Sequence, residues 1–162
     1  MEYKWGKTNE KRAPMTQTRI QSYGEFWTYY QNEHRNPSCR KLHFFGTSMF
    51  IAVDIYCLIT EPLWFGLASI AAVALTVIFW NLERKRNAFP VLFAILIMTA
   101  LANPIILFGS LTAYFWAWVG HFMLEKNRPA TFQYPLWSLV SDFKMYGQML
   151  LRRPWPEQAT NT

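Results

Sequence analysis

Charged residues are absent from long parts of this 162-residue chain. None occurs in residues 62–82 or in residues 88–124, and Asp54 is the single charge between Lys41 and Glu61. A water-soluble domain of this size does not need such stretches, and a disordered chain has too little apolar surface to contain them. The pattern excludes both classes and favours a membrane protein.

Other signals are also missing. The two cysteines, Cys39 and Cys57, cannot build a disulfide framework, so we expect both to be free thiols. The first 40 residues hold no apolar core of a cleavable signal peptide, so the first span is expected to direct insertion itself. The basic residues flank the apolar blocks and form no basic surface studded with aromatic rings, which excludes a nucleic acid as partner.

The apolar blocks are long enough to cross a bilayer. A membrane-spanning helix needs roughly 20 mainly apolar residues. We predict an all-α fold, a polytopic membrane helical bundle with four transmembrane helices near residues 44–60, 63–81, 90–108 and 110–124. The fourth helix is short, which leaves three spans and one re-entrant segment as an alternative.

The basic residues predict the orientation of this bundle. All 16 lysines and arginines lie before the first span, in the 82–89 loop, or after the fourth span. The loops on the other side, at residues 60–62 and at Gly109-Ser110, carry none. Because positive charge stays on the cytoplasmic side, both termini are expected to be cytoplasmic. The protein would be integral to the inner membrane of a bacterium or to the endoplasmic reticulum of a eukaryote.

Amphipathic segments flank the spans and complete a single membrane domain. An aromatic stripe at spacings of three and four predicts an interfacial helix before the spans, with Ile20, Tyr23, Trp27, Tyr30 and His34 on one face. After the spans Pro135 suits a first helical turn, and one face then carries Leu136, Leu139, Phe143, Tyr146 and Leu150. We expect both helices to seal the cytoplasmic mouth of the bundle, with control of substrate entry as the alternative.

The parts of this domain are a polar N-terminus (1–19), an interfacial helix with a first histidine motif (20–43), the spans (44–124), a second motif with an interfacial helix (125–153) and a tail (154–162).

The chain has three histidines, His34, His43 and His121. The first two precede the first span and the third closes the fourth, so the predicted topology places all three at one depth on the cytoplasmic side. A cluster of neutral imidazoles commonly holds Zn, Fe or Cu. Glu125, one helical turn after His121, could supply a carboxylate or orient an imidazole. No compact ligand motif is present, so interfacial histidines that only form hydrogen bonds are the alternative.

Two segments carry a resemblance to a known family. Residues 34–46 read His-Arg-Asn-Pro-Ser-Cys-Arg-Lys-Leu-His-Phe-Phe-Gly, and residues 120–132 read Gly-His-Phe-Met-Leu-Glu-Lys-Asn-Arg-Pro-Ala-Thr-Phe. The first is similar to the His-x-x-Pro-x-Asn-Arg-x-x-His-x-x-Gly signature of the Mpo-like membrane proteins, and the second resembles that family's other signature. Residues 134–139 continue as in its bacterial-type members, and the resemblance covers roughly residues 22–150.

The resemblance implies an enzyme of lipid metabolism. The family resembles the fungal 2-hydroxy fatty acid dioxygenase, which implies an iron(II)-dependent dioxygenase that performs α-oxidation of 2-hydroxy fatty acids. Such an enzyme uses O2 as co-substrate and releases the carboxyl carbon. The resemblance places the Fe(II) ligands at His34, His43 and His121 and gives Glu125 a catalytic role.

Further residues of the two motifs are expected near this metal. Arg128, Arg40 and Lys126 could attract the carboxylate of a fatty acid or lipid substrate, although anchoring on the positive side is the plainer role for at least two of them. Asn127 and Cys39 are expected to support the ligands from outside. The family usually has Asn where this chain has Cys39, so a soft thiol replaces an amide and could alter the metal preference.

Two other functions stay open on the sequence. A small-solute transporter would explain Asp54 inside the first span and the Asn103-Pro104 pair that interrupts the predicted third span. A non-catalytic membrane scaffold with a structural zinc site is the second alternative, because Cys39 can be drawn into a closed site with the histidines.

Overall fold

The computed structural model describes residues 19–156, and every regular element in that range is a helix. The predicted polar N-terminus lies outside this range apart from Arg19, as do residues 157–162 of the predicted tail. The elements are α1 (Tyr23–Glu33), α2 (Pro37–Thr60), α3 (Pro62–Ile78), η1 (Trp80–Arg84), α4 (Phe89–Ala102), α5 (Ile106–Val119), η2 (Gly120–Glu125), η3 (Ala130–Phe132) and α6 (Pro135–Leu150). The predicted all-α class is therefore confirmed.

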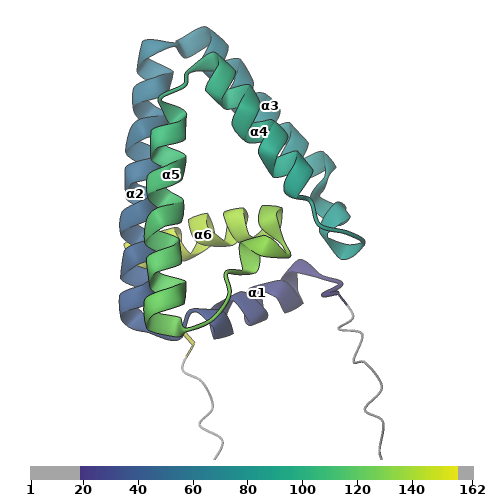
Figure 1. Ribbon diagram of the computed structural model, residues 1–162, viewed down its shortest axis with the longest axis vertical. Coiled ribbons are helices and arrows are strands. Elements are labelled where there is room, and N and C mark those ends of the chain that lie inside the picture. The colour runs from purple at the N-terminus through teal and green to yellow at the C-terminus, as the bar shows by residue number, and fades with distance from the viewer. Residues whose placement is uncertain (1–18, 157–162) are drawn as a thin grey trace, which may run out of the picture.

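The long helices form two antiparallel pairs. Helix α2 packs along α5, and α3 packs along α4 (Figure 1). The pairs meet where α2 turns into α3 and where α4 turns into α5, and they diverge toward the opposite end of the molecule (Figure 1). Helices α1 and α6 lie across that open end, where α6 contacts α1, α2, α4 and η1. This arrangement brings both ends of the described chain to the same end of the molecule.

Glycines allow α2 and α5 to approach closely. A Cβ atom on Gly46 would lie 3.1 Å from the carbonyl oxygen of Ala113, and one on Gly109 would lie 2.9 Å from the Cβ of Val53. Any larger side chain at these two positions would push the helices apart. The two glycines therefore allow the close approach of α2 and α5, against backbone atoms of Ala113 at Gly46 and against the Val53 side chain at Gly109.

Two helices are long and apolar enough to cross a membrane by length and composition, Pro37–Thr60 with 24 residues and Ile106–Glu125 with 20. Helices α3 and α4 are apolar but shorter. Many large apolar side chains of α3 and α4 are exposed, for example Ile70 at 69% and Leu101 at 83%. Exposed apolar surface of this extent marks a membrane or protein contact.

The predicted boundary between the third and fourth spans is wrong. Helix α4 ends at Ala102, and α5 begins at Ile106, so the turn lies at Asn103 and Pro104 and not at Gly109-Ser110. The ring of Pro104 excludes a continuous α-helix, and the Oδ1 of Asn103 accepts a hydrogen bond from the Ile105 amide at 3.1 Å. Asn103 and Pro104 thus connect two helices and do not break a span in its middle.

The predicted N-terminal boundaries are also shifted. The interfacial helix expected in the 20–43 segment is α1, which ends at Glu33 beside the first histidine, but α2 begins at Pro37, seven residues before the predicted span. Asn36 caps α2 by accepting from the amide of Ser38 at 2.8 Å, and proline suits the first helical position. His43 consequently lies inside α2.

Later elements differ from their predictions in similar ways. The predicted 63–81 span ends as a helix at Ile78, and the chain then forms the short helix η1. The predicted 110–124 span becomes a π-helix from Gly120 onward. In α6 the buried residues are Pro135, Leu136, Trp137, Ser138, Ser141 and Met145, whereas Phe143 and Leu150 of the predicted apolar face are exposed. Helix α6 turns a different face inward because it packs against several helices at once.

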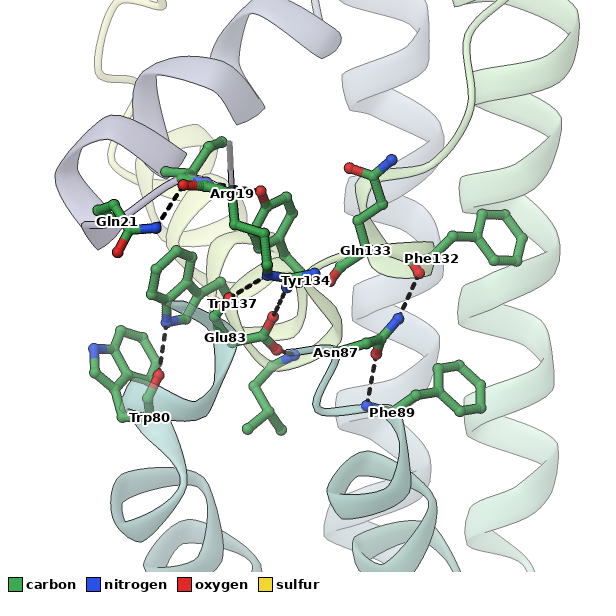
Figure 2. Close-up of polar contacts among 12 residues, drawn as sticks. Arg19, Gln21, Trp80, Glu83, Asn87, Phe89, Phe132, Gln133, Tyr134 and Trp137 are labelled. Atoms are coloured by element: carbon green, nitrogen blue, oxygen red, sulfur yellow. Dashed lines mark hydrogen bonds and ion pairs between the residues drawn. The ribbon is translucent and has the colours of Figure 1, made fainter. Parts of the chain in front are cut away.

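The loop between α3 and α4 is docked onto α6 by polar contacts (Figure 2). The buried Glu83 side chain accepts a hydrogen bond from the Leu136 amide at 2.7 Å and lies 3.7 Å from the guanidinium of Arg19. The indole of Trp137 donates to the Trp80 carbonyl at 3.1 Å. Glu83 therefore caps the N-terminus of α6, where partial positive charge favours a carboxylate.

Candidate metal centre

The three histidines come together at the end of the molecule that α1 and α6 cross. His34 lies in the turn between α1 and α2, His43 in α2, and His121 in the π-helix η2. Their ring centroids are 4.6 Å apart for His34 and His43, 4.6 Å for His34 and His121, and 5.2 Å for His43 and His121. All three side chains are buried. The structure thus brings together three imidazoles that are 9 to 87 residues apart in the sequence.

Each imidazole donates its Nδ1 proton to a fixed acceptor. The acceptor is the Tyr30 carbonyl oxygen at 2.7 Å for His34, an Asp142 carboxylate oxygen at 2.9 Å for His43, and the Asn127 amide oxygen at 2.8 Å for His121. The first two acceptors cannot donate. The third is oriented as an acceptor because the Asn127 nitrogen donates to the backbone and side chain of Glu33 at 2.9 and 2.6 Å.

These bonds leave each Nε2 with a free lone pair. A neutral imidazole with a proton on Nδ1 can only accept at Nε2. The Nε2 atoms of His34 and His43 lie 3.2 Å apart, a distance at which two lone pairs repel unless a proton or a cation lies between them. Burial and the neighbouring His43 and His121 imidazoles lower the pKa of His34 well below its ordinary value, so the neutral form is favoured. Outer hydrogen bonds of this kind are typical of histidines that bind metals.

Asp142 and Tyr30 connect the cluster to α6 and α1. One oxygen of Asp142 accepts from both the Tyr30 hydroxyl and His43, and the Tyr30 ring stacks on the His34 ring at a centroid distance of 4.0 Å. Sequence reasoning missed Asp142 entirely. The signal that could have found it is that Asp142 is the single acidic residue of α6.

Cys39 lies closer to the cluster than the sequence predicted. Its sulfur and the ring nitrogens of His34 and His43 are all within 4.8 Å of one another. Cys39 precedes His43 by one helical turn, and its sulfur packs where a Cβ on Gly120 would lie only 2.8 Å away. A thiol in this position could reach a metal held by the two histidines, as the structural-zinc alternative requires.

Glu125 contacts the backbone of the first motif. Its Oε1 accepts a hydrogen bond from the Asn36 amide at 2.7 Å, which joins the second motif to the N-cap of α2. The α-helical spacing that we expected from His121 does not apply, because residues 120–125 are π-helical. Its catalytic role stays a prediction.

Of the three predicted substrate-binding cations, only the Arg40 side chain hydrogen-bonds to a residue of the cluster. Arg40 donates to the carbonyl oxygens of His34 and Arg35 at 2.9 and 2.8 Å and so holds the turn that carries His34. Arg128 lies over the Phe132 ring at 4.9 Å, and both Arg128 and Lys126 are exposed. None of the three lines the cavity beside the histidines.

A small cavity borders the histidines. Its volume is about 10 Å³, which is room for roughly one water-sized atom. Among its lining residues are the three histidines, Tyr30, Ser138 and Asp142. Buried neutral nitrogen donors around a small cavity, with a thiol and a carboxylate nearby, are a donor set that fits zinc, iron or copper.

Of the comparisons with known proteins, one gives a match. A family model described as "Mpo1-like: 2-hydroxy-palmitic acid dioxygenase Mpo1-like" matches residues 20–154. No curated protein and no solved structure matches the chain significantly. The matched range includes the three histidines, Asp142 and every helix of the described chain.

Proposed function

Because the chain belongs to the Mpo1-like family, we propose that it is an iron(II)-dependent dioxygenase that shortens 2-hydroxy fatty acids by one carbon. The observation that carries this proposal is the set of three buried imidazoles whose Nδ1 protons are all bonded outward. A bound cation would relieve the repulsion between the lone pairs of His34 and His43, whose Nε2 atoms lie 3.2 Å apart. A non-haem iron site needs a few nitrogen and carboxylate ligands and open positions for its substrates.

In this proposal His34, His43 and His121 hold the iron. Bound Fe(II) supplies the redox chemistry with O2 and a positive charge that attracts the oxygens of the acid. Asp142 keeps the proton of His43 on Nδ1 and so keeps its Nε2 available as a ligand. Asn127 does the same for His121. Glu125 is our candidate for an acid or base near the reacting atoms.

We further propose how the protein lies in the membrane. All four long helices are embedded, α2 and α5 across the bilayer and the shorter α3 and α4 beside them, with both termini in the cytoplasm. The site then lies at the cytoplasmic interface, where α1 and α6 rest. A fatty acid would place its head group at this interface and its chain among the apolar helices. Arg128, Arg40 and Lys126 would attract its carboxylate over a longer range.

The proposal is tested by the metal content and by oxygen consumption. The protein is purified without oxygen in detergent, its metals are measured by elemental analysis, and it is then mixed with 2-hydroxypalmitic acid and O2. We expect stoichiometric iron, oxygen uptake that depends on the acid, and a product one carbon shorter. Palmitic acid without the 2-hydroxyl group is the matched control. Iron without oxygen uptake would contradict the enzymatic proposal.

A structural zinc site is the second candidate function, and one observation favours it. The sulfur of Cys39 lies with nitrogens of His34 and His43 within 4.8 Å, and structural zinc sites commonly combine thiolate and imidazole. This alternative predicts tightly held zinc and no oxygen uptake in the same experiment. Replacement of Cys39 by Asn should leave an iron enzyme loaded, whereas it should release a zinc that depends on the thiolate.

A further inference from the structure

Ser138 carries a buried hydroxyl group without a partner in the described chain. Its side chain is 2% exposed, and its Oγ has no hydrogen bond with any residue in the range 19–156. The residue lies in the first turns of α6 and lines the small cavity beside the three histidines. A buried polar atom without a partner is costly and calls for an explanation.

Several other serine and threonine hydroxyls in the helices bond within their own helix. Ser48, Ser69, Thr76, Thr99 and Thr112 all donate to the carbonyl oxygen four residues earlier at 2.7 to 2.9 Å. The corresponding carbonyl for Ser138 belongs to Tyr134, and it accepts only the Ser138 amide. The hydroxyl of Ser138 therefore does not make the bond that a serine in a helix ordinarily makes.

Ser141, on the same helix, provides the closest comparison. It is fully buried, and its Oγ is 3.2 Å from the hydroxyl of Tyr23, outside the cavity. Ser138 instead lies one helical turn before Asp142, and both line the cavity. Helix α6 thus presents two polar groups to the site, of which Asp142 is already bonded to His43 and Tyr30 and Ser138 is free.

We propose that Ser138 hydrogen-bonds to one oxygen atom of the acid head group and so helps to bind and orient the substrate. This inference rests on the proposed function. The cavity has room for about one oxygen atom, and the cations Arg40, Lys126 and Arg128 do not line it. A neutral hydroxyl is therefore available where an oxygen of the ligand would otherwise be buried without a donor.

The test measures binding separately from turnover. Full-length protein loaded with Fe(II) is placed in lipid nanodiscs without oxygen, and 2-hydroxypalmitic acid is titrated while tryptophan fluorescence is followed, since Trp118 lines the cavity. The variants are Ser138→Ala and Ser138→Cys, with Ser141→Ala as the matched control. Iron content is measured for each protein, so that damage to the metal site is detected independently.

We expect Ser138→Ala to raise the dissociation constant about tenfold, which corresponds to about 1.4 kcal/mol. Ser138→Cys should weaken binding by a similar amount because a thiol is a poor hydrogen-bonding group. Ser141→Ala should bind like the wild type, and all proteins should keep their iron. If Ser138→Ala loses the same affinity for palmitic acid, the bond is assigned to a carboxylate oxygen. If it loses affinity only for the 2-hydroxy acid, the bond is assigned to the 2-hydroxyl group.

Two outcomes would overturn the inference. One is wild-type affinity in Ser138→Ala, and the other is loss of iron from that variant, which would make Ser138 a support of the metal site. Failure of the proposed function gives a different result. In that case the wild-type protein itself does not bind 2-hydroxypalmitic acid, whatever the residue at position 138.

Discussion

Helices α2 and α5 differ from α3 and α4 in what holds each pair together. Between α2 and α5 glycines bring the backbones into contact, and the end of this pair carries His43 and His121. In α3 and α4 the hydroxyl groups bond only to their own helix, and the outer faces are exposed apolar side chains such as Ile70. This difference indicates that α2 and α5 fix the geometry of the site, whereas α3 and α4 mainly present exposed apolar surface.

The α3 and α4 pair nevertheless affects the site through its loop. Glu83 and Trp80 hold the first turn of α6, the helix that also carries Ser138 and Asp142 (Figure 2). Near the opposite turn Asn103 donates to the Thr60 hydroxyl at 3.1 Å and joins the two pairs. Helices α3 and α4 therefore influence the candidate site only through the contacts that their ends make with the rest of the molecule.

The largest effect should come from removing a histidine of the first pair. His43→Ala should abolish metal binding, because the variant lacks one of the three clustered imidazoles and its neighbours are fixed by their own hydrogen bonds. Elemental analysis after purification checks this. Ser48→Ala, five residues further along α2, is the control and should keep the metal. Stoichiometric metal in His43→Ala would show that the cluster is not the metal site.

A smaller effect is expected when the support of that histidine is removed. Asp142→Ala should lower metal affinity by about 10- to 100-fold, since His43 loses the acceptor that fixes its tautomer. Competition with a chelator of known affinity measures this change. Asp142→Asn keeps an acceptor oxygen but not the charge, and it should lose less. Equal losses in both variants would show that the charge matters and the hydrogen bond does not.

The loop of the second pair should affect stability and its dependence on pH. Burial raises the pKa of Glu83 to about 7 from an ordinary value of 4.5, although the Leu136 amide and Arg19 favour the charged form. The folded protein then holds this proton more tightly than the unfolded chain. This stabilisation is complete below about pH 4.5 and is lost as the pH rises through about 7.

Glu83→Gln should remove that dependence. In detergent the wild type should lose stability between pH 5 and pH 8 by on the order of 3 kcal/mol, and the variant should change much less. Glu83→Ala leaves the Leu136 amide without its acceptor and should cost about 1 to 3 kcal/mol across this range. Thermal unfolding at several pH values measures both. An identical pH profile in wild type and Glu83→Gln would contradict the assignment.

The smallest effect is expected on the outer face of the second pair. Ile70 is 69% exposed and far along α3 from the site, so Ile70→Ala should change stability in detergent by less than about 0.5 kcal/mol. Its metal affinity should equal that of the wild type. A loss of metal in this variant would show that the outer face of α3 affects the metal site, which would contradict the assignment of the site geometry to α2 and α5.

The sequence predicts the helical class well and several boundaries poorly. The long stretches without charged residues correspond to apolar helices, so the existence of these helices could be inferred from composition. The turn at Asn103-Pro104 was misplaced to Gly109-Ser110 because the apolar run continues across it, and local proline sterics decide the break. Gly109 is needed for the close approach to Val53 and not for a turn.

The site was predictable in its histidines and not in its surroundings. The charge pattern predicts that His34, His43 and His121 share one side of a membrane, and the structure brings their ring centroids within 5.2 Å of one another. The partners Asp142 and Ser138 come from another helix, and nothing in its periodicity marks which of its polar residues faces the cluster. The π-helix was also hidden, because the pattern of residues 120–125 is equally compatible with an α-helix.

The position of the cavity residues along the chain has a consequence for biosynthesis. Tyr30, His34 and His43 are made early, whereas His121 and Asp142 are made late, and the α3 and α4 hairpin separates the two groups. Helix α6 is the last of these helices to be synthesised. A metal that needs residues from both groups can therefore be held only after α6 has been made, and a chain truncated before α6 would lack Asp142.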